Sequence, residues 1–146
     1  MPPSDPSLLD GIENALGAGL PHLLLQFVVA LALLSAGVAT YMAATPFRER
    51  ELIAEGNTAA GVVLFGAILA LAIPIAATLA TTGLVLDLIV WGIVAVLLQL
   101  LVIAGISLVF RHLRAAIQHG NVAAALALAG TQLAVALLNA AVMIPN

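Results

Sequence analysis

Four long stretches without a charged residue dominate this sequence. They are residues 14–47, 56–86, 88–110 and 115–146, and the four Arg and seven Asp or Glu residues all lie outside them. A helix needs roughly 20 apolar residues to cross about 30 Å of hydrocarbon, and each stretch is longer than that. With 64% hydrophobic and only 8% charged residues, the whole composition fits the same interpretation. We therefore expect an all-α membrane protein with four transmembrane helices.

Prolines, glycines and polar residues set the expected boundaries of these helices. The expected spans are about 21–44, 58–81, 85–109 and 121–144. They form a first transmembrane hairpin over 21–81 and a second over 85–144, after a polar, extracytoplasmic tail over 1–20 with a helical turn at the membrane surface around 7–17. Pro21 suits the first turn of the first helix, because that position needs no backbone N–H donor.

The dipeptide Gly-Asn occurs at the entrance to two of the apolar runs, at residues 56–57 and 120–121. When the chain is shifted by 64 positions, residues 53–74 align with 117–138 and ten pairs are identical, both dipeptides included. Self-similarity at a fixed period indicates a structural repeat. The sequence therefore predicts two tandem, parallel-repeat helical hairpins. Gly56 and Gly120 suit helix C-termini, and Asn57 and Asn121 suit N-caps.

The charged segment 45–57 is the most distinctive loop. Thr45 followed by Pro46 is a typical helix start, which predicts a short surface helix over 46–55. Glu49 and Glu51 lie within it. We consider these residues, with the two Gly-Asn pairs, as structural or partner-contact candidates. A hinge between helices is the simpler interpretation of Gly-Asn, and an ion- or partner-binding role is the alternative.

Arginine predicts the orientation of the chain in the membrane. All four Arg residues lie in loops 45–57 and 111–120, and the chain contains no Lys. Cytoplasmic loops are enriched in positive residues. We therefore expect both loops in the cytoplasm and both termini outside.

Amide side chains lie within the expected spans at Gln26, near the outer boundary, and at three candidate positions, Gln99, Gln132 and Asn139. A polar side chain in hydrocarbon needs a partner, and a neighbouring helix usually supplies one. The simpler interpretation is that these amides hold helices together. The alternative is that they line a path for an ion or substrate.

The chain has no sequence motif for catalysis or for a cofactor. It lacks a His-x-x-x-His pair, a nucleophile elbow, a Walker loop and a glycine-rich dinucleotide turn, and it contains no Cys. We expect no enzyme activity, no cofactor and no metal. A basic patch with interleaved aromatic residues is also missing, so we expect no nucleic-acid partner.

An ordered series of residues resembles a known family. The series is Tyr41, Thr45-Pro46, Glu49, Glu51-Leu52-Ile53, Gly56-Asn57-Thr58-Ala59-Ala60, Gly66, Pro74, Trp91, Gln99, Gly120-Asn121 and Asn139-Ala140-Ala141. It resembles the YjfL-like inner-membrane proteins, known as domain of unknown function 350. The resemblance covers residues 22–144 and implies a bacterial inner-membrane protein with four spans in two repeated hairpins. It implies no mechanism.

Two functions from different classes follow from these features. The first is a non-enzymatic membrane subunit that self-associates or docks a cytoplasmic partner through the 45–57 segment. The second is a small channel or transporter component whose path is lined by the three amides. In either case the lipid bilayer surrounds the chain, and a homo-oligomer or another membrane or cytoplasmic protein is the expected partner.

Overall fold

The computed structural model describes residues 8–45 and 48–144, and within these ranges every regular element is a helix. The elements are α1 (Leu8–Asn14), the π-helical η1 (Ala15–Gly19), α2 (Leu20–Ala44), α3 (Glu49–Ala54), α4 (Thr58–Thr81), α5 (Val85–Val109), α6 (Arg111–Gln118) and α7 (Val122–Met143). The long helices α2, α4, α5 and α7 have 25, 24, 25 and 22 residues. At about 1.5 Å per residue, each is long enough to cross a bilayer. The prediction of four long apolar helices is confirmed.

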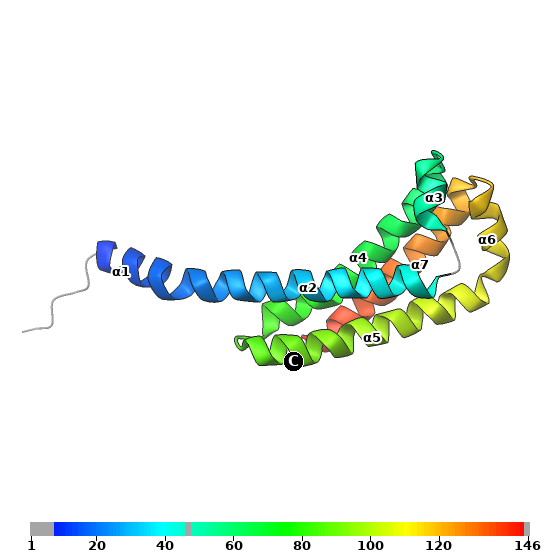
Figure 1. Ribbon diagram of the computed structural model, residues 1–146. Coiled ribbons are helices and arrows are strands. Elements are labelled where there is room, and N and C mark those ends of the chain that lie inside the picture. The colour runs from blue at the N-terminus through cyan, green and yellow to red at the C-terminus, as the bar shows by residue number, and fades with distance from the viewer. Residues whose placement is uncertain (1–7, 46–47, 145–146) are drawn as a thin grey trace, which may run out of the picture.

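Helical backbone precedes the first expected span, in the region where the sequence predicts a helical turn. α1, η1 and α2 follow one another without a break and extend beyond the rest of the bundle (Figure 1). Pro21 does lie in the first turn of α2, but η1 precedes it directly. Ile12, Leu16 and Leu20, spaced four residues apart, continue the apolar stripe of α2 toward the N-terminus. Much of the expected tail over 1–20 is therefore helical.

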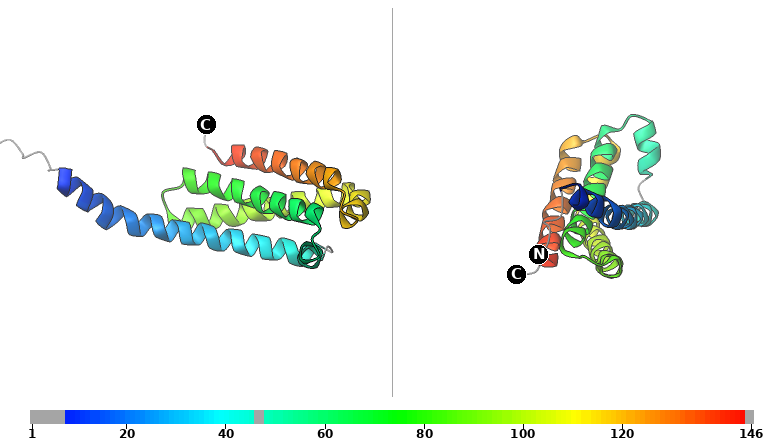
Figure 2. Two further views of the ribbon diagram at one scale, coloured as in Figure 1. Left: turned by 90° about the horizontal axis from the view of Figure 1, so that it is seen from above. Right: turned by 90° about the vertical axis from the view of Figure 1, so that its left-hand side faces the viewer.

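The closest packing in the bundle is between α4 and α7, which lie side by side (Figure 2). Gly66 of α4 permits this approach, since a Cβ built at this glycine would lie 2.5 Å from Cβ of Ala129 on α7. The fully buried residues Ala67 and Ala125 belong to the same two helices. Small residues let helix backbones come close, and the resulting van der Waals contacts hold membrane helices together.

Large apolar side chains cover the outside of the bundle. Leu23 and Phe27 of α2, and Leu97 and Leu101 of α5, are each more than half exposed. Hydrocarbon is the solvent in which such a surface is stable, because lipid tails are as apolar as leucine. The exposed surface is therefore that of a helical membrane protein.

The two short helices lie together at one end of the bundle. α3 and α6 are on the same side, whereas α1 and the C-terminal end of α7 lie toward the opposite end (Figure 1). The fold thus gathers the two arginine-containing segments into one region.

Candidate functional site

The glycines of the two Gly-Asn pairs end α3 and α6 in the same way. Gly56 has φ = 85° and Gly120 has φ = 84°, a left-handed conformation that glycine adopts readily. The N–H of Gly56 donates to the carbonyl of Ile53 (3.0 Å), and that of Gly120 donates to the carbonyl of Ile117 (2.9 Å). Both turns therefore satisfy carbonyls that a helix end leaves unpaired.

The asparagines begin the long helices that follow. Oδ1 of Asn57 accepts a hydrogen bond from the N–H of Ala60, and Oδ1 of Asn121 accepts one from the N–H of Ala124, both at 3.0 Å. The predicted N-caps are confirmed, since a side-chain oxygen that binds the third helical N–H defines this cap.

Asn57 has a second set of contacts. Its Nδ2 donates to the carbonyls of Ile117 (3.1 Å) and Gln118 (3.0 Å) at the end of α6. The last carbonyls of a helix have no partner within that helix. Asn57 thus caps α4 with its oxygen and fastens α6 to α4 with its nitrogen, so the first Gly-Asn pair is more than a hinge.

Thr45 ends a helix where the sequence predicts that it begins one. It is the C-cap of α2, and its Oγ1 donates to the carbonyl of Tyr41 at 2.6 Å. The reason is local, because a threonine hydroxyl easily reaches the carbonyl four residues earlier. α3 begins at Glu49 instead, with Arg48 as an N-cap that makes no side-chain cap bond. Pro46 lies outside the described residues.

A buried tyrosine–glutamate pair connects α2 with α3. Tyr41 and Glu49 are each only 3% exposed, and the Tyr41 hydroxyl donates to Oε1 of Glu49 at 2.6 Å. Oε2 of Glu49 has no hydrogen-bond partner among the described residues. Burial raises the pKa of Glu49 above its ordinary value, and the bond from Tyr41 offsets part of that rise.

Sequence reasoning missed this pair. It placed Glu49 on a short surface helix over 46–55 and assigned no contact to Tyr41. The sequence did show an aromatic residue and an acid on either side of Thr45-Pro46. Whether their side chains meet depends on the direction that the chain takes after α2, which the sequence pattern does not give.

The remaining charges of α3 and α6 are mostly on the surface. Glu51 forms an ion pair with Arg48 at 3.0 Å, and both side chains are largely exposed. Pairs of this kind add little to stability. Arg50 and Arg111 are also exposed. The end of the bundle therefore presents charges of both signs.

The structure brings the three intramembrane amides together between α5 and α7. Gln99 is fully buried, Gln132 is 1% exposed and Asn139 is 6% exposed. Nδ2 of Asn139 lies 3.4 Å from Oε1 of Gln99 and 3.3 Å from the carbonyl of Ala95, and Nε2 of Gln99 lies 3.4 Å from the carbonyl of Gln132. These are long bonds, but they connect the two helices at several points.

Within the described ranges, no group of three or more His, Cys, Asp or Glu is arranged to hold a metal ion. The candidate functional features are instead the two fastened surface helices α3 and α6, the buried carboxyl of Glu49, and the buried amide cluster between α5 and α7.

Two comparisons with known proteins identify the same family. Residues 15–143 match the family described as Domain of Unknown Function (DUF350). The UPF0719 inner membrane protein YjfL of Escherichia coli strain K12 is 32% identical over 117 residues, which cover 80% of this chain and 89% of that protein. The same protein from Escherichia coli O157:H7 has the same identity and coverage. No solved structure matches. With its long apolar helices, the chain is thus a multi-pass inner-membrane protein, and it belongs to the DUF350 family.

Proposed function

We propose that this protein is a non-enzymatic membrane subunit that docks a cytoplasmic partner through the exposed residues of α3 and α6. We call this the docking surface, and its members are Arg48, Arg50, Glu51, Glu55, Arg111 and Gln118. The observation that carries the proposal is that both short helices are fastened to the bundle.

Two contacts fasten them. The buried hydrogen bond between Tyr41 and Glu49 holds α3 to the end of α2. Asn57 holds the C-terminus of α6 to the start of α4. A surface that is already ordered loses less conformational entropy on binding than a mobile loop does. This preorganisation supports recognition of a partner by α3 and α6.

The charges of the docking surface indicate the chemistry of the partner. Arg50, Arg111 and the acidic Glu55 are all exposed at this end of the bundle. A mixed pattern of charge favours a polar, charged protein surface, and complementary charge contributes chiefly to specificity and association rate. Because all four Arg residues belong to this end, the positive-inside rule puts it in the cytoplasm and both termini outside.

We further propose that the two hairpins are a tandem repeat. In support, Gly56 and Gly120 have nearly the same φ, and Asn57 and Asn121 cap α4 and α7 with the same bond length. The hairpins differ in their short helices, since the segment before α7 lacks the buried glutamate.

The buried amides support a structural role over the alternative of a conduction path. Gln99, Gln132 and Asn139 are almost fully buried. Asn139 donates to Gln99 and to the carbonyl of Ala95, and Gln99 donates to the backbone carbonyl of Gln132. Groups that line an aqueous path need contact with water.

Site-specific photocrosslinking in native membranes tests the docking surface. A photoreactive residue at Glu55 or at Gln118 should capture the same cytoplasmic protein. The same photoreactive residue in place of Leu84, which is exposed between α4 and α5, should not capture that protein. The charge reversal Glu51→Arg should reduce the yield from position 118. No adduct, different proteins at the two positions, or adducts only between two copies of this chain would contradict the proposal.

A further inference from the structure

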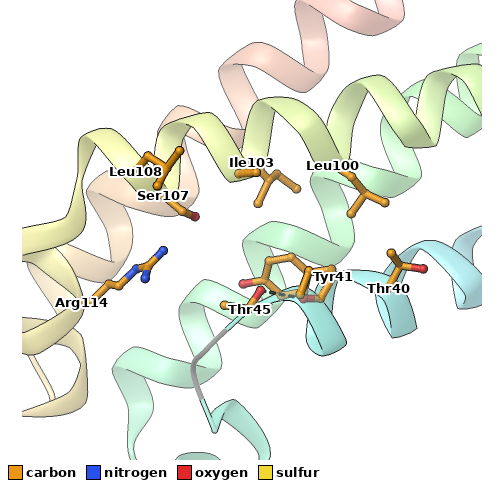
Figure 3. Close-up of a pocket in the computed structure, with 10 residues that line it drawn as sticks. Thr40, Tyr41, Thr45, Leu100, Ile103, Ser107, Leu108 and Arg114 are labelled. Carbon is orange, nitrogen blue, oxygen red and sulfur yellow. Dashed lines mark hydrogen bonds between the residues drawn. The ribbon is translucent and has the colours of Figure 1, made fainter.

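A cavity of about 250 Å³ lies between the C-terminal ends of α2 and α5, next to Arg114 of α6 (Figure 3). We call it the interfacial slot. Its lining residues are Thr40, Tyr41, Ala44, Thr45, Leu100, Ile103, Ala104, Ser107, Leu108 and Arg114.

The lining changes character along the slot. On α5, Leu100, Ile103 and Ala104 give one end an apolar wall, and Ser107 follows farther along. From Leu100 to Ser107 the helix rises about 10 Å. At the far end, the guanidinium of Arg114 points into the space between the two helices (Figure 3). Thr40 lies beside Leu100 at the inner end, but its hydroxyl donates to the carbonyl of Ala36 on its own helix, and Leu108 lies toward the Arg114 end (Figure 3). The slot is therefore mainly apolar toward the middle of the bundle, and its charged group is at the end that carries α3 and α6.

The polar end lies at the depth of lipid headgroups. α2 ends at Ala44 and α5 ends at Val109, so Thr45 and Arg114 lie just beyond the apolar helices. The boundary of the hydrocarbon coincides with the ends of helices of this length. A slot that is polar at this depth and apolar deeper has the same distribution of polarity as a phospholipid.

The hydrogen-bonding groups favour an anionic phosphodiester with hydroxyl groups. Arg114 provides the positive charge of the lining, and arginine binds phosphate well through several N–H donors. The hydroxyl of Thr45 already donates to the carbonyl of Tyr41, so its oxygen can act toward a ligand only as an acceptor. Such an oxygen would receive a hydrogen bond from a glycerol headgroup.

Glu49 is connected to the slot through Tyr41, which is one of the lining residues. Its carboxyl is bonded to the Tyr41 hydroxyl and does not line the slot. Burial raises the pKa of Glu49, which lessens the negative charge that would oppose an anion.

We propose that the interfacial slot binds one anionic glycerophospholipid from the leaflet at the α3–α6 end. Its phosphate contacts Arg114 and Ser107, a headgroup hydroxyl meets the Thr45 oxygen, and one acyl chain follows Leu100 and Ile103. Basic pockets between transmembrane helices bind anionic headgroups in this way. The proposal does not depend on the docking surface.

Native mass spectrometry of the full chain in detergent, titrated with phosphatidylglycerol, tests the proposal. We expect tighter binding of phosphatidylglycerol than of phosphatidylcholine, whose headgroup has no net charge and no hydroxyl. Arg114→Gln should weaken phosphatidylglycerol binding about fivefold, the effect of one cationic side chain near an anionic lipid. Arg111→Gln, on the same helix but outside the slot, should bind as the wild type does.

A second variant tests the apolar end without touching a charge. Ala104→Phe fills the slot where the acyl chain would lie, and it should also weaken phosphatidylglycerol binding. The binding of phosphatidylglycerol by Ala104→Phe tests the proposal if Arg114→Gln fails to fold. Inorganic phosphate in excess should not displace the lipid, since it cannot use the apolar wall. Equal binding of the two lipids, wild-type binding by a folded Arg114→Gln or Ala104→Phe, equal losses in both arginine variants, or displacement by phosphate would overturn the proposal.

Discussion

At the scale of single residues, the Tyr41–Glu49 pair keeps an ionisable carboxyl out of water. An unpaired carboxylate is costly to bury, and one hydrogen bond replaces only part of its hydration. Oε1 of Glu49 receives the Tyr41 hydroxyl, whereas Oε2 has no partner among the described residues. The protonated acid therefore suits this position better than the anion does, in agreement with the raised pKa of Glu49.

This pair makes stability depend on pH. Because burial raises the folded-state pKa of Glu49, the folded protein binds this proton more readily than the unfolded chain does. The resulting stabilisation is fully present below the unfolded-state pKa and is lost as the pH rises through the folded-state pKa. Glu49→Gln, which resembles the protonated acid, should match the wild type in acid and exceed it in stability at higher pH.

Thermal unfolding in detergent micelles over a range of pH measures this effect. Glu51→Gln is the matched control, since it makes the same chemical change at an exposed position of the same helix. A Glu49→Gln variant that loses stability relative to the wild type as the pH rises would contradict the assignment.

The two asparagine caps should respond differently to the same substitutions. Asn57→Ala and Asn121→Ala each remove a cap, which costs about 1 kcal/mol. Asn57→Ala should cost about 1 kcal/mol more, because its Nδ2 also bonds the carbonyls of Ile117 and Gln118. Aspartate keeps the cap oxygen but has no donor, so Asn121→Asp should be near neutral and Asn57→Asp should be destabilising. Denaturation in micelles measures all four, and equal losses at both sites would refute the second role of Asn57.

At the scale of helices, the close contact between α4 and α7 depends on a glycine, Gly66, which has no side chain. A Cβ at Gly66 would meet Cβ of Ala129 at 2.5 Å and its Cα at 3.0 Å. Gly66→Ala should therefore destabilise the protein by about 1–3 kcal/mol, as overpacking does. Gly61→Ala, on the same helix with nothing within 4 Å of its Cβ, should be neutral or slightly stabilising. Unfolding free energies in micelles compare the two, and equal effects would show that the close approach is unimportant.

The amide cluster between α5 and α7 predicts a modest energetic role. Gln99→Leu should weaken the protein by about 1 kcal/mol or less, the range for polar contacts between membrane helices. Cysteine in place of Gln99 should react slowly with small polar thiol reagents, because the side chain at this position is fully buried. Cysteine in place of Leu97, exposed on the same helix, shows whether membrane-embedded positions react at all. Rapid modification at position 99 alone would indicate a water-filled path.

Much of this architecture follows from local sequence signals. The uncharged stretches and the Gly-Asn pairs were sufficient to predict the long helices and the N-caps, because both depend on neighbouring residues in the chain. The rotation of each helix about its axis is not a local property. Gln99 and Asn139 could therefore be recognised as polar but not matched with each other. Thr45 was misplaced for a similar reason, since its hydroxyl had two possible helices to cap.

At the scale of the whole molecule, the arginine residues and the hydrogen bonds that fasten the short helices lie at the same end of the bundle. The region around α3 and α6 contains four of the features described above. They are the slot, the Tyr41–Glu49 pair, the Asn57 contacts and the docking surface. The opposite end carries Asp10, Glu13 and Asp87 but no Arg. A membrane protein of this polarity is expected to have its arginine end in the cytoplasm.

The side of the membrane on which α3 and α6 lie tests this account most directly. The chain contains no Cys, so single cysteines can be placed at Glu51 and His119 near these helices, and at Glu13 and Gly83 toward the other end. In intact cells, an impermeant thiol reagent should label positions 13 and 83 and should reach positions 51 and 119 only after the inner membrane is permeabilised. Labelling of 51 and 119 in intact cells, with protection of 13 and 83, would place the docking surface outside the cytoplasm and contradict the proposed function.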